Sequence, residues 1–334
     1  MTGPTTAVPH DTASVLEVRD LRVDFPGRHG TVTALDGISL SIKPGEILGV
    51  VGESGAGKSM TGLAVQGLIE PPGHISGGEV WLAGRRIDQL SDRAMEKIRG
   101  REIGAIFQDP LTSLNPLFSV GSQLSETIRL HLDMTRAEAR ARALHLLREV
   151  GIPAADERID HYPHQFSGRM RQRVVIALAL AGEPKLIIAD EPTTALDVSI
   201  QAQITALLRR LCDDLGTAVM MVTHDMGVIA ETADRVAVMY AGRIAEVGEV
   251  REVLRAPGHP YTKGLMGSIP ALGRRVDKLV QIDGAMPRLD AIPQGCAFHP
   301  RCTVSGPRCS KDRPNPVVTA QGFNACWHAQ GGVQ

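Results

Sequence analysis

The stretch GESGAGKS, residues 52–59, constrains the fold of this chain more than any other part of its sequence. It fits the pattern G-x-x-x-x-G-K-[ST] and directly follows EILGVVG (46–52), a short apolar run typical of a buried strand. Glycines let such a loop curl until its backbone N–H groups surround phosphate oxygens. Strand, loop and following helix together predict an α/β protein with a phosphate-binding loop at the end of a parallel strand.

Further runs predict the rest of the sheets. KLIIADE (185–191) and TAVMMVTHD (217–225) have the apolar composition of central parallel strands covered by helices on both faces. LEVRDLRVDF (16–25) alternates apolar and polar residues, and GEVWLAGRRI (78–87) has the pattern of a hairpin turning at Ala83-Gly84. We therefore expect a parallel-sheet core with a small antiparallel β layer near the N-terminus.

The middle of the chain, residues 120–165, is predicted to be mainly helical, and Gly151 is a natural helix stop. A second hairpin is expected at RVAVMYAGRIAEVGE (235–249), after which the sequence becomes rich in Pro and Gly. The helical stripe is predicted at Ala137, Ala141, Leu144, Leu147 and Val150. The predicted domains are a disordered leader at 1–14, a nucleotide-binding domain at 15–255 with a helical subdomain at about 110–180, and a C-terminal extension at 256–334.

Composition excludes several classes of protein. Of 334 residues, 43% are hydrophobic and 22% charged, which is ordinary for a globular protein, and the formal net charge of −1 gives no bulk attraction to nucleic acid. The first 14 residues have no apolar segment of the kind that signal peptides contain. No apolar run approaches the roughly 18 residues of a membrane span. The chain is expected to be soluble unless a partner holds it at a membrane.

The phosphate-binding loop predicts the chemistry of the site. Lys58 would reach the β- and γ-phosphates, and the Ser59 hydroxyl would bind Mg²⁺. Asp190, at the end of its strand, would complete the Mg²⁺ shell, and Glu191 would polarise the attacking water. The predicted ATP-binding residues of the loop are Gly52, Glu53, Ser54, Gly55, Ala56, Gly57, Lys58, Ser59 and Met60.

Several motifs occur together in a fixed order, namely GESGAGKS, IFQDP, SGRMRQR, IIADEPTTALD and VTHD. This succession resembles the ATP-binding cassette (ABC) ATPases. The stretches FQDPLTSLNP (107–116), ALDVSIQAQI (195–204), HPYTKGLMGSIPAL (259–272) and GCAFHPRC (295–302) are more specifically similar to the ATPase subunits of bacterial oligopeptide and dipeptide permeases. The resemblance covers residues 15–330, essentially the whole chain.

The resemblance implies roles for further residues. Phe25 would stack on adenine, although a strand-end aromatic is also compatible with a core position. Gln108 would link Mg²⁺ and the attacking water to the surface that meets the membrane subunits, and His224 would hold the γ-phosphate and support Glu191. Asp197 would belong to the loop that crosses to an opposite ATPase. The catalytic set implied is Glu191, His224, Gln108 and Lys58.

The resemblance also implies the function and the partners. The chain would hydrolyse ATP at the cytoplasmic face of the inner membrane, as a peripheral subunit that powers peptide import. Its partners would be a second ATPase, two transmembrane permease subunits and an extracytoplasmic substrate-binding protein. A nickel or other small-solute importer is the alternative. A soluble ABC ATPase that acts on nucleic acid or ribosomes is less expected, because this sequence shows no long coiled-coil insertion, tandem cassette or strongly basic surface.

The stretch FSGRMRQR (166–173) predicts a helix start with unusual charge. Ser167 and Gly168 precede VVIALALA, yet the first turn carries three arginines where the helix macrodipole favours acidic residues. This pattern predicts that an anion docks there. The resemblance identifies Ser167, Gly168, Arg169 and Met170 as the signature facing the ATP of the partner.

Arg169 departs from the family pattern, which has a second glycine at this position. A side chain there would crowd the amides that approach phosphate, or would reach the phosphate itself as an arginine finger. Crowding predicts a heterodimer, in which a different ATPase supplies an intact signature to the ATP bound by this chain.

Four of the five cysteines, Cys296, Cys302, Cys309 and Cys326, fall in the last 39 residues and suggest a separate unit. Four soft thiolates in a short, loop-rich segment suit a metal, but their spacing lacks the paired C-x2-C typical of zinc ribbons. The permease ATPases that this chain resembles carry a [4Fe–4S] cluster on this cysteine pattern, so the resemblance implies such a cluster here. The alternatives for these four cysteines are a bound Zn²⁺, or no ligand or disulfides. Cys212 is expected to be a lone buried thiol, and His299 and His328 to be structural.

Overall fold

The computed structural model describes residues 14–28, 30–107, 112–193, 198–267, 282–319 and 322–328. The predicted site residues Gln108 and Asp197 and nearly all of the predicted leader lie outside these ranges. Within them, no helix combines the length and the apolar character needed to cross a bilayer.

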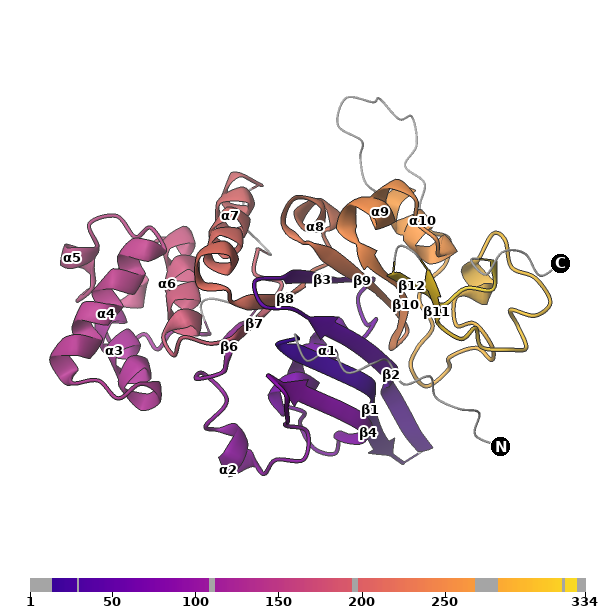
Figure 1. The fold of residues 1–334 in the computed structure, drawn as a ribbon, viewed down its shortest axis with the longest axis horizontal. Helices are drawn as coiled ribbons and strands as arrows, with labels where there is room; N and C mark the ends of the chain where they lie inside the picture. The colour runs from indigo at the N-terminus through magenta and orange to yellow at the C-terminus, as the bar shows by residue number, and fades with distance from the viewer. Residues whose placement is uncertain are drawn as a thin grey trace.

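A mixed sheet with the strand order β11-β12-β10-β9-β3-β8-β7-β6 forms the centre of the molecule (Figure 1). Its strands β9, β3, β8, β7 and β6 run parallel, and β10, β12 and β11 extend it antiparallel. The strands predicted at 46–52, 185–191, 217–225 and 235–249 are confirmed. Their bounds are β3 (Ile47–Val51), β6 (Ile103–Ile106), β7 (Leu186–Asp190), β8 (Ala218–Val222), β9 (Arg235–Tyr240) and β10 (Arg243–Glu249).

The antiparallel layer predicted near the N-terminus is confirmed as a four-stranded sheet of order β2-β1-β4-β5. The hairpin between β4 and β5 turns at Ala83 and Gly84, whose φ angles are 46° and 79°. Positive φ at both positions matches the right-handed twist of the flanking strands. The bounds are β1 (Leu16–Gly27), β2 (Gly30–Ile42), β4 (His74–Leu82) and β5 (Arg85–Arg86).

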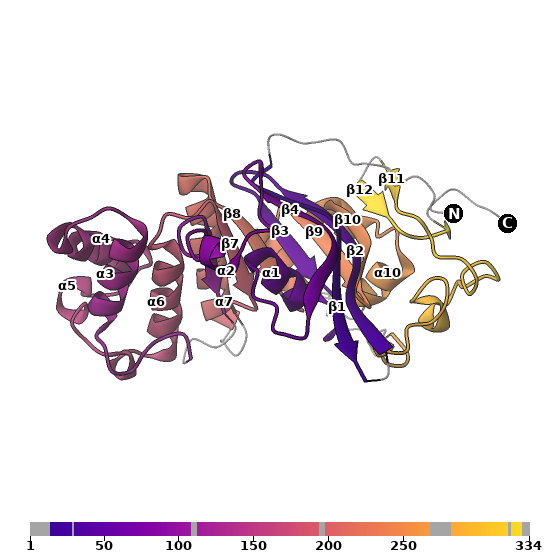
Figure 2. The same ribbon diagram turned by 90° about the horizontal axis from the view of Figure 1, so that it is seen from below.

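Both faces of the central sheet are covered. In Figures 1 and 2, α1 and the antiparallel layer lie on one face, whereas α7, α8 and α9 lie on the other. Strand β3 contributes side chains to the hydrophobic core on each side of the sheet. Ile47 and Val51 belong to one buried cluster, and Leu48 and Val50 belong to the other. The helices are α1 (Lys58–Gln66), α2 (Asp92–Met95), α7 (Val198–Leu215), α8 (Met226–Thr232) and α9 (Val250–Arg255).

A helical arm projects from the β6 end of the sheet (Figure 1). The prediction that residues 120–165 are mainly helical is confirmed, and a capping box between Thr135 and Glu138 begins the longest helix of the arm. The elements are α3 (Val120–His131), α4 (Arg136–Glu149), α5 (Ala155–Arg158), η1 (Pro163–Gln165) and α6 (Gly168–Leu180).

The predicted stripe of α4 is partly wrong. Ala137 and Ala141 are exposed, whereas Ala139, Ala143 and Leu146 are buried. Alanine gains little from burial, so the leucines decide which face turns inward. Leu147 and Val150 fit both stripes and are buried, and Gly151 ends the helix at a φ of 76°, as predicted.

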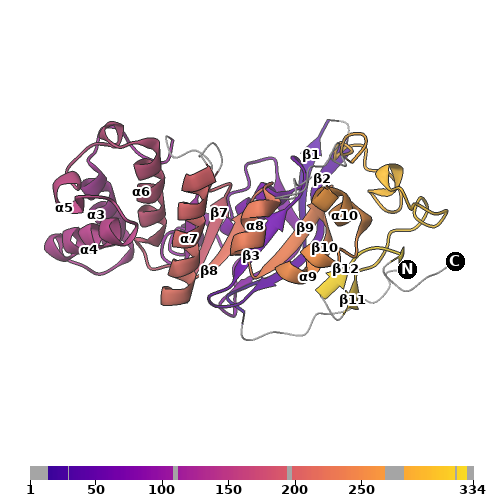
Figure 3. The same cartoon turned by 90° about the horizontal axis from the view of Figure 1, so that it is seen from above.

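The C-terminal extension joins the central sheet. Strand β12 pairs with β10 through Val247 and Phe323, so the sheet crosses the predicted boundary at residue 255. The cysteine segment, residues 296–326, is therefore attached to the nucleotide-binding domain and is not an independent unit. Figure 3 shows α10 beside β10. The extension contains α10 (Pro260–Gly267), η2 (His299–Arg301), β11 (Val317–Thr319) and β12 (Gly322–Asn324).

Candidate nucleotide site

The loop between β3 and α1 has a backbone that only glycine can adopt at two positions. Gly52 has a φ of 153°, and a Cβ there would lie 2.3 Å from the carbonyl oxygen of Met239. Gly57, which precedes the first residue of α1, has a φ of 102°. The loop therefore delivers the chain to the N-terminus of α1, where unpaired amides and the helix dipole favour an anion.

Lys58 is held inside this loop. Its Nζ donates to the carbonyl oxygens of Gly52 and Glu53, at 2.9 and 3.0 Å, and only 6% of the residue is exposed. Burial lowers the pKa of Lys58, an effect that nearby Glu191 and Asp190 oppose. The ammonium is thus preorganised beside the loop amides.

Ser59 and Asp190 bring two oxygen ligands together. The hydroxyl of Ser59, in the first turn of α1, donates to Oδ1 of Asp190, the last residue of β7, at 3.0 Å. Burial raises the pKa of Asp190 above its usual value, and the adjacent carboxylate of Glu191 adds to this effect. A hydroxyl and a carboxylate at one point are the oxygen donors that Mg²⁺ prefers, so these residues fit the predicted metal.

Glu191 and His224 form the second pair. Nδ1 of His224 lies 3.0 Å from Oε1 of Glu191. Glu191 has a φ of 48°, uncommon for a residue with a side chain, and its N–H donates to the Val222 carbonyl oxygen on β8 at 2.8 Å. Such backbone outliers cluster at functional sites. Lys58, Ser59, Asp190, Glu191 and His224 thus lie at the carboxyl ends of adjacent strands, as predicted.

Phe25 lies near the end of β1. It is half-buried, and its ring packs closely against Gly73, where a Cβ would lie 2.4 Å from Cε1 of Phe25. The ring is therefore partly a packing residue, with part of it accessible. Among the other loop residues, Ser54 is exposed, Ala56 is buried and Met60 is half-buried.

The signature residues lie in the helical arm at the start of α6, separate from α1 (Figures 1 and 2). Ser167 caps the helix as predicted, because its Oγ accepts from the backbone N–H of Met170. Gly168 is exposed, with open space where a Cβ would point. The buried amide of Gln172 donates to the Pro192 carbonyl oxygen at 2.8 Å, so α6 is tied to the segment that follows Glu191.

The three arginines of this turn have different surroundings. Nε of Arg171 donates to the carbonyl oxygen of Phe166 at 3.0 Å, and Nη1 of Arg173 donates to that of Val150 at 2.7 Å. Arg169 is exposed. Arg171 and Arg173 thus each donate to a carbonyl oxygen within the chain, and the docking of an anion at this turn stays a prediction.

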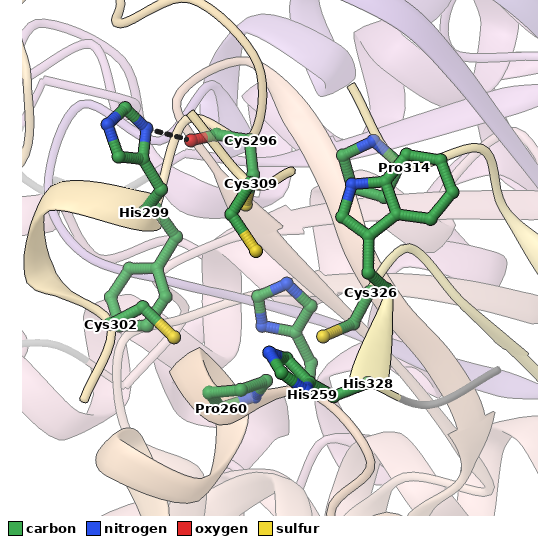
Figure 4. A pocket seen from close by; sticks show the side chains of 11 residues that line it. His259, Pro260, Cys296, His299, Cys302, Cys309, Pro314, Cys326 and His328 are labelled. Carbon is green, nitrogen blue, oxygen red and sulfur yellow. Dashed lines mark hydrogen bonds between the residues drawn. The ribbon is translucent and has the colours of Figure 1, made fainter. Parts of the chain in front are cut away.

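The four C-terminal cysteines line one pocket with Phe298, His299 and His328 (Figure 4). None of the four forms a disulfide. Burial raises the pKa of Cys296 to about 11 and also raises that of Cys302. Nδ1 of His299 lies 2.9 Å from the Cys296 carbonyl oxygen, which supports its structural role.

A single metal ion does not fit this pocket. In the described parts of the chain, no three His, Cys, Asp or Glu side chains converge as a group able to hold one ion. A zinc site needs four ligands at about 2.0–2.3 Å from one centre. The ligand geometry therefore does not support the Zn²⁺ alternative, and the expected [4Fe–4S] cluster stays a prediction. Cys212 is a lone buried thiol of α7, as expected, and burial raises its pKa to about 12.

Three residues that contact the phosphate-binding loop were not predicted from the sequence. The hydroxyl of Tyr261 accepts from the N–H of Glu53 at 2.9 Å, and Arg301 forms an ion pair with the Glu53 carboxylate. Met286 packs on the loop, because a Cβ on Gly55 would lie 3.0 Å from its Cε. All three come from the extension, and no local pattern pairs them with a loop some 200 residues away.

Two family profiles match the chain. The ABC transporter family matches residues 35–194, which contain the phosphate-binding loop, the signature helix and β7. The family described as oligopeptide/dipeptide transporter, C-terminal region, matches residues 245–309, which contain three of the four C-terminal cysteines.

Relatives and solved structures agree with these matches. The chain is 46% identical to the oligopeptide transport ATP-binding protein OppD of Salmonella typhimurium over 322 residues, 96% of each chain. It is also 46% identical to the dipeptide transport ATP-binding protein DppD of Bacillus subtilis over 315 residues, 94% of each chain.

Among solved structures, a dimer of the ATP-binding cassette MJ0796 bound to ADP and Pi has a TM-score of 0.63 and 30% identity, over 71% of this chain and 99% of that one. The structure of cbiO1 from Clostridium perfringens has a TM-score of 0.64 and 31% identity, over 73% and 92%. The nucleotide loop, the fold and both profiles lead to one conclusion: the chain belongs to the ABC transporter ATPases, in the group that carries the oligopeptide/dipeptide transporter C-terminal region.

Proposed function

We propose that this chain is the ATP-hydrolysing subunit of a membrane importer that takes up oligopeptides or dipeptides. One observation carries the proposal: a single chain joins an ABC transporter match at 35–194 to an oligopeptide/dipeptide transporter match at 245–309. Relatives named for peptide import support it over almost their whole length.

The reaction is transfer of the γ-phosphoryl group of ATP to water, in which the protein contributes mainly positioning and charge stabilisation. The N-terminus of α1 offers its amides to the phosphates. Lys58 adds a positive charge, exchanging its bonds to the Gly52 and Glu53 carbonyl oxygens for bonds to the β- and γ-phosphates. The adenine would lie on the accessible part of Phe25.

The oxygens of Ser59 and Asp190 would hold Mg²⁺, with Gln108 as a further ligand. When bound, Mg²⁺ neutralises negative charge on the β- and γ-phosphate oxygens. Asp190 would act in its ionised form, and the nearby charge of Lys58 favours that form.

Glu191 is the proposed general base, and it accepts the proton of the attacking water. His224 holds the Glu191 carboxylate in place through the contact between its Nδ1 and Oε1. Because an ionised carboxylate can only accept hydrogen bonds, Nδ1 must be the donor. The strained backbone of Glu191 and its bond to β8 fix the carboxylate further. His224 is well exposed, at 63% of its side chain, and so can also contact the γ-phosphate.

A second ATPase would complete the site. The signature, Ser167 to Met170, would face the ATP of the partner, and Asp197 would cross to it. Because Arg169 replaces a glycine and is exposed, we infer that it crowds the partner's phosphate. A non-identical partner with an intact signature would then serve the ATP of this chain, so the assembly would be a heterodimer.

The remaining partners would be two permease subunits and an extracytoplasmic substrate-binding protein, which place the chain peripherally at the cytoplasmic face of the inner membrane. ATP binding would close the ATPase dimer and hydrolysis would reopen it. The exposed Phe107, Leu117 and Phe118 flank the segment that contains Gln108, and they would meet the permease.

We further propose that Cys296, Cys302, Cys309 and Cys326 bind a [4Fe–4S] cluster. The four thiols line one pocket, and each iron corner of such a cluster takes one cysteine, so the sulfurs need not converge on a single centre. The same argument disfavours zinc. The cluster would stabilise a loop-rich segment, because metal binding supplies folding free energy.

The experiment that tests this function is purification of the chain with its membrane partners and analysis of what the associated substrate-binding protein carries. We expect co-purification with two integral membrane proteins, and short peptides on the binding protein. Bound Ni²⁺ without peptide would replace the peptide substrate with nickel. Recovery with ribosomes or DNA in place of membrane proteins would contradict import altogether.

A further inference from the structure

Arg301 connects the cysteine segment to the phosphate-binding loop. It is the last residue of η2 and immediately precedes Cys302 in the sequence. Its Nη1 and Nη2 donate to the two carboxylate oxygens of Glu53 at 2.8 and 3.0 Å, across 248 positions of sequence. Such a two-pronged pair depends on the planar fork of arginine and has a defined geometry.

The guanidinium is fixed by the extension as well as by Glu53. Its side chain is only 8% exposed, in contrast to the mobile surface ion pairs that contribute little. Nε donates to the Asp283 carbonyl oxygen at 2.9 Å, and Nη2 also donates to that of Gly284 at 3.1 Å. The group also lies over the ring of Tyr240, 5.8 Å from its centroid. Arg301 therefore has little freedom to follow Glu53 if the loop moves.

Glu53 passes this constraint to the phosphate site. Its backbone N–H donates to the hydroxyl of Tyr261, a fully buried residue of α10. Its carbonyl oxygen accepts from Nζ of Lys58 at 3.0 Å. One residue thus connects the extension, through its side chain and its N–H, to the lysine that meets the nucleotide.

The conformation of the cysteine segment sets the position of Arg301. The N–H of Cys296 donates to the Cys309 carbonyl oxygen at 2.8 Å, and the N–H of His299 donates to that of Cys296 at 2.9 Å. These bonds begin the turn that becomes η2. A change that loosens this turn would therefore move Arg301 relative to the loop.

We propose that Arg301 is a positioning residue for the nucleotide site and that, through Glu53, it couples the order of the cysteine segment to the affinity for ATP. The extension is then part of the ATP-binding apparatus. This coupling does not depend on which solute the importer moves, nor on whether the cysteines hold a cluster.

The test uses the full chain and its assembled transporter. Arg301→Gln keeps the size and polarity of the side chain but removes its charge and fork, and we expect the Kd for MgATP to rise about 5- to 10-fold, on the scale of one lost charged interaction. The KM for ATP should rise in parallel, with kcat at saturating ATP within about two-fold of wild type, because ground-state binding is lost and chemistry is not. Arg301→Lys should recover part of the affinity.

Arg288→Gln is the matched control, because Arg288 also lies in the C-terminal extension, its side chain is 84% exposed, and it pairs with Asp290 on the surface. Its Kd should equal that of wild type. Glu53→Gln breaks the pair from the loop side and leaves the cysteine segment unchanged. Its Kd for MgATP therefore tests the role of the pair even if Arg301→Gln folds poorly. We expect the same weakening in Glu53→Gln, and no further weakening in the double variant.

Two results would overturn the proposal. One is a Kd for MgATP in Glu53→Gln that equals the wild-type value. The other is a double variant whose loss of affinity is the product of the two single losses, since two residues acting through one contact cannot give independent effects.

Discussion

His224 Nδ1 lies 3.0 Å from Oε1 of Glu191, and the two residues follow the neighbouring strands β7 and β8. The pair explains why a carboxylate after β7 can act on water, because the imidazole holds Oε1 and thereby orients the carboxylate. Because parallel strands end at the same edge, the sheet itself brings together two residues that are 33 positions apart.

Removal of either member of this pair should slow hydrolysis. We expect His224→Ala to lower kcat of the assembled transporter about 100-fold, and Glu191→Gln to lower it at least as much, which is the usual scale for general-base catalysis. The KM for ATP should change little. His145→Ala is the control, because His145 is 64% exposed on α4 and far from β7 in sequence. Near-normal kcat in Glu191→Gln would refute the assignment of the base.

Asp36 predicts a pH dependence of stability. Burial alone would raise the pKa of its carboxyl, but the charges of Arg313 and Arg243 outweigh burial, so the pKa lies below its ordinary value. The ionised form therefore stabilises the fold above pH about 4, and this contribution is lost as the pH falls through the lowered pKa. Arg313 comes from the extension and Arg243 from β10, so the carboxylate joins separate elements.

Urea unfolding of Asp36→Asn should measure this contribution. We expect a loss of about 1–3 kcal/mol between pH 5 and 8, shrinking below pH about 4. Asp160→Asn is the control, since Asp160 pairs with Arg140 on the exposed surface and should change the unfolding midpoint little. A loss for Asp36→Asn that stays constant down to pH 2 would contradict the ionic explanation.

Most of the fold could be predicted because its signals are local. The apolar runs gave the parallel strands, and Ala83-Gly84 gave the hairpin turn. The buried face of α4 could not be read fully, since Ala137 and Ala139 differ in exposure but not in side chain. The attachment of the extension through β12 depends on pairing between distant segments, which one sequence does not reveal.

The site shows the same division. Lys58, Ser59, Asp190, Glu191 and His224 follow from motifs in which strand and spacing fix the geometry. The pairing of Glu53 with Arg301 had no such signal. The charge pattern at the start of α6 has a partly structural cause that its letters do not reveal, because Arg171 and Arg173 donate to carbonyl oxygens inside the protein.

Arg169 gives a test of inequivalent ATP sites. If it crowds the partner's phosphate, Arg169→Gly should leave the ATPase rate of the assembled transporter unchanged or raise it by about two- to five-fold, since amides can then approach the anion. If it acts as an arginine finger, the same change should lower the rate steeply, by 10³-fold or more. Arg136→Gly is the control, because Arg136 is exposed at the start of α4. Arg171→Gly is unsuitable as a control, because it would also remove the bond from Arg171 to the carbonyl oxygen of Phe166.

The cysteine pocket gives a test by colour and metal content. Protein purified without oxygen should be brown, with about four iron and four sulfide per chain. Cys302→Ala should lose the iron and lower the melting temperature, whereas Cys212→Ala should keep the iron, because Cys212 is buried alone in α7. Colourless protein with one zinc per chain would eliminate the cluster.

The central claim is that this chain converts ATP hydrolysis into peptide import. The most direct measurement is the ATPase rate of the complete transporter in proteoliposomes, with and without peptide-loaded binding protein, together with uptake of labelled peptide. We predict that loaded binding protein stimulates hydrolysis, and that Glu191→Gln abolishes both hydrolysis and uptake. Hydrolysis that ignores loaded binding protein, or uptake that continues in Glu191→Gln, would contradict the account.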